Sequence, residues 1–257
     1  MNLLKTQLKS IDHKLFKSFF YGVYFLIIKL LNKIYEKKFI YKNTHFVNIY
    51  KKNKLSKLCE KYGTDKGFVN FDKKKPFPWK PHTYSDYYYN LFNSFKDKVK
   101  LVFECGIGSN NLKFSSNMAS KGKPGASLRV WKDYFTQANI YGSDIDRDIL
   151  FNENRIKTFY VNQLDKSSIY KMWKAVKKKN FDIIIDDGMH SYQAAITFFL
   201  HSYNKLRSGG YYIIEDVSYS YLKKLSQALE TYNFEIVKLE TNLHVYNDNN
   251  LIIIRKE

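Results

Sequence analysis

Short apolar runs alternate with helical patterns along the chain from residue 100 to its end. The intervening segments SLRVWKDYF, IYKMWKAV, AAITFFLHSYNKL and YLKKLSQALETY place apolar residues at helical spacing. This alternation predicts an α/β fold with a doubly wound, mostly parallel sheet and helices on both faces. The sheet is expected to have seven strands: KLVFEC, NIYGSD, KTFYVN, FDIIIDD, YYIIED, FEIVKLE and NLIIIRKE. The last two have no helix between them, so we expect them to pair as a hairpin.

The first 99 residues lack this alternation. Residues 1–50 are predicted to form a basic, amphipathic helical extension. Residues 51–99 are predicted to form a lid or linker. They contain a short helical pattern ending near Tyr62, a polar turn YGTDKG and a Lys/Pro-rich loop over 73–81. Residues 100–257 are then one α/β domain, which the length of the chain also favours.

The apolar segment LFKSFFYGVYFLIIKLL, residues 15–31, has only 11 uncharged residues between Lys17 and Lys29. A membrane-spanning helix needs about 18 to 20 apolar residues, so the segment is not expected to cross a bilayer. Two interpretations stay open. The helix either packs on protein, its own domain or a second subunit in a homo-oligomer, or lies on an anionic membrane surface.

The net charge indicates which partners the protein could bind, and the cysteines indicate its cellular compartment. Of the net charge of +19, more than half lies in residues 1–60, which hold 13 lysines and three acidic residues. The basic excess is therefore concentrated outside the α/β domain, and no nucleic-acid partner is expected. Cys59 and Cys105 match no metal-binding spacing, which favours a reducing, cytoplasmic location, with the inner face of the membrane as an option.

A glycine-rich turn follows the first strand of the α/β domain. Glu104 and Cys105 lead into Gly106-Ile107-Gly108, which lets the backbone turn tightly and approach a ligand at the carboxyl edge of the sheet. A GxGxxG motif is not met because residue 111 is Asn, so a dinucleotide cofactor is disfavoured.

Acidic and amide residues follow the next two strands. Asp144 ends the second strand, where an acidic residue holds ribose hydroxyls in open α/β sheets; a solvated loop carboxylate is the alternative. After the third strand, the segment Asn162-Gln163-Leu164-Asp165 has groups suited to an adenine edge. Asp165 is equally suited to cap the helix that follows.

The densest group of chemically active residues follows the fourth and fifth strands. Asp186-Asp187-Gly188-Met189-His190 ends the fourth strand, and Glu215-Asp216 ends the fifth. Neighbouring parallel strands bring these ends together, so the carboxylates of Asp187, Glu215 and Asp216 are expected to converge on a hard cation, Mg²⁺ or Mn²⁺. His190 is suited to accept a proton from a hydroxyl beside that cation, because its ordinary pKa is near neutral.

Six segments together, KYGTDKG, FECGIG, GASLRVWKDYF, IYGSDID, FDIIIDDGMH and SGGYYIIEDV, resemble the class I S-adenosylmethionine-dependent methyltransferases that methylate sugar hydroxyls on macrolides and related glycosides. The similarity runs from about Lys61 to about Val217. It implies a class I methyltransferase catalytic domain over 100–257 that uses S-adenosylmethionine and a divalent metal.

The resemblance also implies roles for single residues. Asp187, Glu215 and Asp216 resemble the metal ligands and His190 the general base, with Asp186 near the cofactor or supporting the metal site. The cofactor residues would be Glu104, Gly106 and Gly108 at the methionine part, Asp144 at the ribose, Gln163 and Asp165 at the adenine, and Tyr62, Thr64 and Lys66 closing over the site. Met189 departs from the family pattern, which has a serine there.

The acceptor implied by this resemblance is a sugar hydroxyl. We expect a hexose or heptose of a surface polysaccharide or capsule, either still linked to a nucleotide or already in the glycan. The lysines at 73, 74, 75, 80, 121 and 123 could provide a positive potential that attracts a diphosphate. The rivals are a nucleic-acid methyltransferase, a non-catalytic membrane-associated subunit that binds the cofactor, and a hydroxylase. DDGMH replaces the Asn/Asp-Pro-Pro-aromatic motif of base methylation, and no 2-His-1-carboxylate arrangement is evident.

Overall fold

The computed structural model describes residues 44–47, 52–67, 75–239 and 248–257. The chain divides into two compact units, Met1–Lys42 and Asn43–Glu257, and every described residue belongs to the second. The predicted packing or membrane contact of residues 15–31 lies outside the described residues and stays a prediction. Within the described part of the chain, no helix combines the length and the apolar composition that crossing a bilayer requires.

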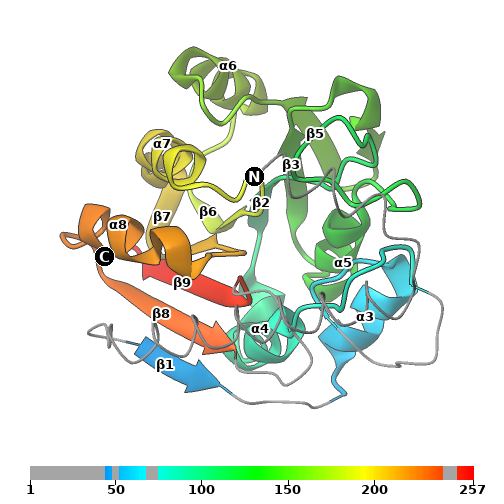
Figure 1. Cartoon of the computed structure of the whole chain (residues 1–257), viewed down its shortest axis with the longest axis horizontal. Helices are drawn as coiled ribbons and strands as arrows, with labels where there is room; N and C mark the ends of the chain where they lie inside the picture. Colours follow the sequence, from blue (N-terminus) through cyan, green and yellow to red (C-terminus); the bar gives the residue numbers. More distant parts are fainter. Residues whose placement is uncertain (1–43, 48–51, 68–74, 240–247) are drawn as a thin grey trace, which may run out of the picture. The chain divides into compact units, whose positions relative to one another are not determined.

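One sheet organises the second unit (Figure 1), in the order β1-β8-β9-β7-β6-β2-β3-β5-β4. Neighbouring strands from β7 through β6, β2 and β3 to β5 run parallel, β9 is antiparallel to both β7 and β8, and β4 is antiparallel to β5. The strands are β1 (Thr44–Val47), β2 (Leu101–Cys105), β3 (Asn139–Asp144), β4 (Asn152–Glu153), β5 (Ile156–Tyr160), β6 (Phe181–Asp186), β7 (Leu206–Ile214), β8 (Phe234–Leu239) and β9 (Asn250–Arg255).

The sheet confirms the predicted fold class and corrects the number of strands. The seven predicted strands form β2, β3, β5, β6, β7, β8 and β9, and the last two pair antiparallel as expected. The described sheet has nine strands because β1 adds in parallel to β8 at one edge and the two-residue β4 adds to β5 at the other. Both additions are short and lack the apolar run by which a buried strand is recognised.

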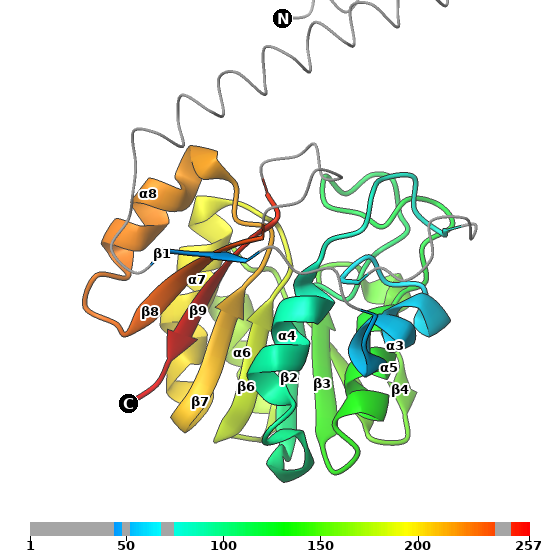
Figure 2. The ribbon, with the colours of Figure 1, turned by 90° about the horizontal axis from the view of Figure 1, so that it is seen from below.

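Helices cover both faces of the sheet. Figure 2 shows α3, α4 and α5 on one face and α6, α7 and α8 on the other. Short 3₁₀ turns lie at Lys96–Lys98, Arg147–Ile149 and Tyr203–Lys205. The helices are α3 (Lys54–Tyr62), α4 (Tyr84–Phe92), α5 (Ala126–Tyr134), α6 (Lys166–Val176), α7 (Tyr192–Ser202) and α8 (Tyr219–Ala228).

Aromatic side chains fill the space between the sheet and the helices. On one face, Phe103 of β2 packs against Trp173 of α6 at a ring-centroid distance of 4.5 Å. On the other, Tyr88 of α4 packs edge-on against Trp131 of α5 at 5.7 Å. Leu55 of α3 and Phe92 of α4 are fully buried in the same core. The described part of the predicted lid or linker, 51–99, therefore packs as part of the α/β unit, and its proposed boundaries stay a prediction.

The end of α3 directs the following loop toward the carboxyl edge of the sheet. Gly63 caps the helix in the left-handed conformation, φ 80°, which favours glycine. The loop is then tied to the start of α4, because Ser85 donates its backbone N–H to the carbonyl of Lys66 at 2.8 Å. Residues 64–66 are held there by backbone hydrogen bonds, which fixes the position of the Lys66 backbone.

Candidate active site

Four parallel strands end at one edge of the sheet and carry the predicted site residues there. The register aligns Cys105 of β2 with Ser143 of β3 and with Asp186 of β6, and aligns Asp186 with Ile214 of β7. The backbone bonds continue beyond the strands, since Asp187 donates its N–H to the carbonyl of Cys105 at 2.8 Å. These contacts confirm the prediction that the residues following these strands lie together at one edge of the sheet.

Gly106 is required by the close approach of two of these segments. Its φ is +85°, and a Cβ built on it would lie 1.9 Å from the carbonyl oxygen of Asp187. Any side chain at this position would push the 186–190 turn away from β2. The glycine thus allows the cofactor-side turn and the acidic turn to lie against each other.

A cavity of about 380 Å³ opens at this edge, within the size range of small-molecule sites. Gly106, Gly108, Asp144 and Gln163 line one part of it, which we call the cofactor half. The part that we call the acceptor half is lined by Asp65, Lys66, Trp79, His82, Tyr84, Asp187, His190, Glu215, Asp216 and Asp248.

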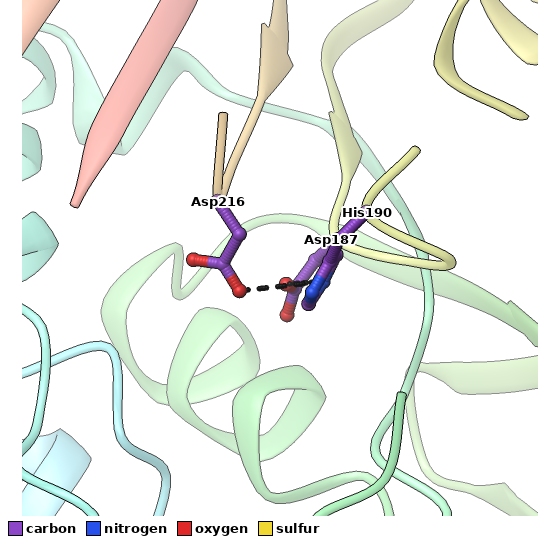
Figure 3. Close-up of side chains that lie close together, drawn as sticks. All are labelled: Asp187, His190 and Asp216. Carbon is purple, nitrogen blue, oxygen red and sulfur yellow. Dashed lines mark hydrogen bonds and ion pairs between the residues drawn. The ribbon is translucent and has the colours of Figure 1, made fainter. Parts of the chain in front are cut away.

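Three side chains of the acceptor half converge from two strand ends, as Figure 3 shows. His190 Nε2 lies 3.2 Å from Asp187 Oδ1 and 3.3 Å from Asp216 Oδ2. One potential ligand atom from each of the three lies within 4.8 Å of the others, which is close enough for one cation. The two carboxylate oxygens suit Mg²⁺ or Mn²⁺, whereas an imidazole nitrogen is a ligand that softer divalent metals such as Zn²⁺ prefer.

The electrostatics of this cluster favour an imidazolium between two carboxylates. Burial lowers the pKa of His190, but the charges of Asp216 and Asp187 outweigh it and raise the pKa to about 10. Burial raises the pKa of Asp216, but His82 and His190 outweigh it and lower the pKa to about 2. A proton on the histidine thus balances the carboxylates when no other cation lies between them.

The backbone at two of these residues is in an uncommon conformation. His190 has φ 51° and Asp216 has φ 53°, both in the left-handed region that non-glycine residues seldom adopt. Such conformations cost about 1 to 3 kcal/mol and gather at functional sites, where the surrounding structure holds them in place. Here they turn the two side chains toward each other.

Lys66 lies among the acidic residues beneath this cluster. Its ammonium group contacts Asp187 Oδ2 at 2.5 Å, Glu104 Oε1 at 3.1 Å and the carboxylate of Glu215, and only 3% of its side chain is exposed. Burial lowers the pKa of Lys66, but Asp187, Glu215 and Glu104 outweigh it and raise the pKa well above its ordinary value. The lysine is therefore a permanent cation in this network.

Glu215, predicted as a metal ligand, is held by protein groups on both of its oxygens. Tyr88 donates to Oε1 at 2.6 Å, and Lys66 donates to Oε2. Glu215 lines the cavity but is not one of the three residues whose ligand atoms converge. The structure thus brings Asp187 and Asp216 together with His190, which was predicted as a base, and leaves Glu215 beside them.

In the cofactor half, two predicted residues have defined partners. Asp144 accepts hydrogen bonds from the backbone N–H groups of Ile107, at 2.9 Å, and Asp146, at 3.0 Å. Gln163 donates to Asp186 Oδ1 at 2.6 Å and accepts from the backbone N–H of Met189 at 2.8 Å. Asp144 anchors the glycine turn, and Gln163 braces the 186–190 turn.

Five residues that were predicted to bind the cofactor do not line the cavity. Asp165 caps α6 by accepting from the N–H of Ser167 at 2.9 Å, which is the second of the two roles expected for it. Tyr62 donates to Asp133 at 2.6 Å, and Trp131 donates to Glu104 at 2.7 Å. Thr64 and Asp186 are buried. Their predicted cofactor roles are not tested by these contacts and stay predictions.

The sequence argument missed several residues of the acceptor half. Tyr84 donates to Asp216 Oδ1 at 2.5 Å, and His82 Nε2 lies 3.4 Å from the same oxygen. Asp65, Trp79 and Asp248 also line the cavity. The signal available in the sequence was the run HTYSDYYY, where Tyr84 and Tyr88 recur at helical spacing after a histidine.

Known proteins provide an independent comparison, although no protein-family model matches the chain. It is 32% identical over 167 residues to an 8-demethyl-8-α-L-rhamnosyl tetracenomycin-C 2′-O-methyltransferase of Streptomyces olivaceus, covering 65% of this chain and 38% of that protein. It is 31% identical over 172 residues to mycinamicin VI 2″-O-methyltransferase of Micromonospora griseorubida, covering 66% of this chain and 38% of that protein. The chain thus matches about two fifths of the length of these curated relatives.

Solved structures agree with the sequence comparison. MycE methyltransferase from the mycinamycin biosynthetic pathway, in complex with Mg and SAH, superposes with a TM-score of 0.56 at 26% sequence identity. The match covers 80% of this chain and 55% of MycE. The described part of the chain therefore has the class I methyltransferase fold, and the chain is similar in sequence to the two O-methyltransferases named above.

Proposed function

We propose that this chain is an S-adenosylmethionine-dependent O-methyltransferase that methylates a sugar hydroxyl with the help of a divalent cation. The observation that carries the proposal is the meeting of Asp187, His190 and Asp216 in the same cavity as Asp144 and the glycine turn. By name, the two relatives reported above are O-methyltransferases of a rhamnosyl tetracenomycin and of mycinamicin VI. The solved structure of MycE contains Mg and SAH.

The cofactor half suits a nucleoside with a sulfonium group. S-adenosylmethionine supplies the methyl group when bound. Asp144 follows β3 with its carboxylate beside the cavity, where it can accept from ribose hydroxyls, and Gly108 lets the backbone come close to the ligand. Gln163 keeps the adjoining turn in place through Met189 and Asp186. The donor would thus be held by rigid strand ends, as alignment for an in-line displacement requires.

The acceptor half suits a hydroxyl that must lose its proton. A divalent cation between Asp187 and Asp216 would lower the pKa of a bound hydroxyl. His190 Nε2 faces both carboxylates, so it is placed to take that proton at the position where the hydroxyl would lie. Lys66 and Tyr88 hold Glu215, and Lys66 also holds Asp187, which keeps the carboxylates in position.

The roles of His190 and Glu215 can be separated by measuring Mn²⁺ binding to the full chain by electron paramagnetic resonance. We expect D187N and D216N to lose Mn²⁺ binding, and H190Q to retain it while kcat falls by about 10² to 10⁴. Loss of Mn²⁺ binding in H190Q would instead make His190 a ligand. If E215Q binds Mn²⁺ like the wild type, Glu215 is not a ligand.

The proposed reaction is tested by titrating the full chain with S-adenosylmethionine and SAH, and by assaying methyl transfer to sugars with Mg²⁺ present or chelated. We expect both compounds to bind and turnover to depend on the metal. The finer proposal is that the acceptor is a hexose or heptose of a surface polysaccharide, nucleotide-linked or already in the glycan. If neither compound binds, the proposal fails, and turnover only on nucleic acid would replace the sugar acceptor.

A further inference from the structure

The acceptor half has a wall that the proposed chemistry does not use. It is built by two loop segments, residues 64–67 and 75–83. The backbone N–H of His82 in the second donates to the carbonyl of Asp65 in the first at 2.7 Å. Asp65, Trp79 and His82 from these loops all line the cavity. The wall therefore belongs to the same cavity as the cluster of Asp187, His190 and Asp216.

Trp79 is fixed from several sides. Its indole N–H donates to Asp65 Oδ2 at 2.6 Å, its ring stacks on that of Phe77 at 5.7 Å, and its carbonyl accepts from Lys75 Nζ at 2.7 Å. Phe77 is buried, whereas Trp79 is half-buried and lines the cavity. A rigid indole in a polar cavity offers an apolar surface at little entropic cost, and the C–H face of a pyranose ring fits such a surface.

His82 connects this wall to the cluster. The ring is 6% exposed, stacks on Tyr84 at a centroid distance of 4.5 Å, and lies with Nδ1 3.1 Å from Asn249 Oδ1. Its Nε2 atom lies 3.4 Å from Asp216 Oδ1. A ring that lies on Trp79 would therefore be close to the residues that act on its hydroxyl.

The charge of the acceptor half decides which sugars fit. Among the described residues that line it, five are acidic and one is a lysine, Lys66, which already contacts three carboxylates. With His190 neutral, as its role as a base requires, these five carboxylates exceed the combined charge of Lys66, His82 and a divalent cation, so a phosphate or carboxylate on the sugar ring would be repelled. The acidic residues are Asp65, Asp187, Glu215, Asp216 and Asp248.

We infer that Trp79, Asp65 and His82 form the acceptor subsite, and that it takes an uncharged pyranose stacked on Trp79. The inference rests on the proposed function and sharpens it, because it favours a sugar already in a glycoside over a sugar next to a diphosphate. Asp65 contributes both the orientation of the indole and the charge that disfavours anionic rings.

The test measures binding of sugar probes to the full chain by saturation-transfer NMR, with SAH and Mg²⁺ present. The probes are methyl glucopyranoside and methyl rhamnopyranoside as neutral rings, and methyl glucuronide and glucose 1-phosphate as anionic ones. We expect saturation transfer to a neutral ring, at least a tenfold weaker response from the anionic rings, and a change in tryptophan fluorescence on binding that W79F abolishes. The other two tryptophans, Trp131 and Trp173, are buried.

Variants separate the subsite from general effects. W79A is expected to lower the affinity for the neutral probe by about tenfold. W79F should retain most of that affinity because an aromatic ring remains at position 79. Y170A is the matched control, since Tyr170 is 69% exposed on α6 and does not line the cavity. D65N keeps an oxygen for the indole N–H and removes the charge, so discrimination against glucuronide should fall several-fold.

Three results would each contradict the proposed subsite. The first is that W79A binds neutral rings as well as the wild type, the second is that the protein prefers anionic rings, and the third is that neither neutral probe shows saturation transfer. The titration with SAH distinguishes these outcomes from failure of the proposed function. W79A should bind SAH like the wild type, whereas absence of SAH binding in the wild type would contradict the proposed methyl transfer itself.

Discussion

The ammonium nitrogen of Lys66 lies 2.5 Å from Oδ2 of Asp187, while Oδ1 of the same carboxylate faces His190 at 3.2 Å. A single carboxylate thus joins a buried structural cation to the group proposed to move a proton. Replacing the lysine would leave Glu104, Asp187 and Glu215 without their shared counter-ion in a buried position.

We therefore expect K66M to lower the free energy of unfolding by about 3 to 5 kcal/mol in metal-free protein, measured by urea denaturation. Added Mg²⁺ should recover part of this loss, because it neutralises Asp187. K61M is the matched control, since Lys61 pairs with Asp133 at 2.9 Å but is 59% exposed, and solvent screens such a pair so that it adds little to stability. Equal losses in the two variants would contradict the role of Lys66.

The raised pKa of His190 predicts a pH dependence of stability in metal-free protein. The folded state binds the imidazole proton more tightly than the unfolded state, because the pKa rises from 6.5 to about 10. The stabilisation is fully present below pH 6.5 and is lost as the pH rises through about 10. The difference in unfolding free energy between wild type and H190Q should therefore shrink from pH 7 to pH 10.

The control for this pH series is H201Q, a histidine on α7 outside the cavity. The difference in unfolding free energy between wild type and H201Q should not shrink in the same way from pH 7 to pH 10. Because about a third of the His190 side chain is exposed, solvent screens part of the effect, and the direction of the change is the informative quantity. A constant difference between wild type and H190Q over this range would show that the two carboxylates do not stabilise the imidazolium.

Gln163 is expected to act on the site by holding the 186–190 turn. Q163L removes the bonds to Met189 and Asp186 and should lower the unfolding free energy by about 1 to 3 kcal/mol. It should also weaken SAH binding in calorimetric titration. Q193L removes a longer bond to Thr197, 3.2 Å, on an exposed position of α7, and should leave SAH binding unchanged.

Gly106 is expected to be intolerant of any side chain. G106A places a Cβ 1.9 Å from the carbonyl oxygen of Asp187 and should abolish SAH binding or prevent folding. G209A tests the backbone strain alone, since Gly209 has a similar φ of +71° but meets only Arg207 Nη1 at 3.2 Å. Thermal melts should show a loss of about 1 kcal/mol for G209A and a larger loss for G106A. Comparable melting temperatures would contradict the steric argument.

The pattern of the sequence predicted the parallel core of the fold because each central strand is buried on both faces and therefore reads as an apolar run. β6, with the sequence FDIIID, is fully buried along its length. The same rule missed β1 and β4, which are short edge strands. Helix α4 was also missed, although its buried residues Tyr84 and Tyr88 recur at helical spacing.

Strand ends explain why part of the site was predictable. Residues that directly follow parallel strands must lie at one edge of the sheet, so the sequence placed Asp144, Asp187 and Asp216 there. The sequence could not assign the side chains that contact these carboxylates, because those side chains come from loops whose paths no local sequence pattern determines. Lys66, Tyr84 and His82 come from the segment between β1 and β2, and they lie more than 100 positions away from Asp187 and Asp216 along the chain.

The sequence by itself thus determined the order of strands and helices, the edge at which the acidic turns gather, and the class of proteins to which the chain is related. Only the tertiary structure decided which carboxylates are free to converge: Glu215 is held by Lys66 and Tyr88, whereas Asp187 and Asp216 face His190. The physical reason is that strand alternation and turn composition are local properties, whereas neutralising a buried charge requires whichever long-range group the folded chain brings within hydrogen-bond distance.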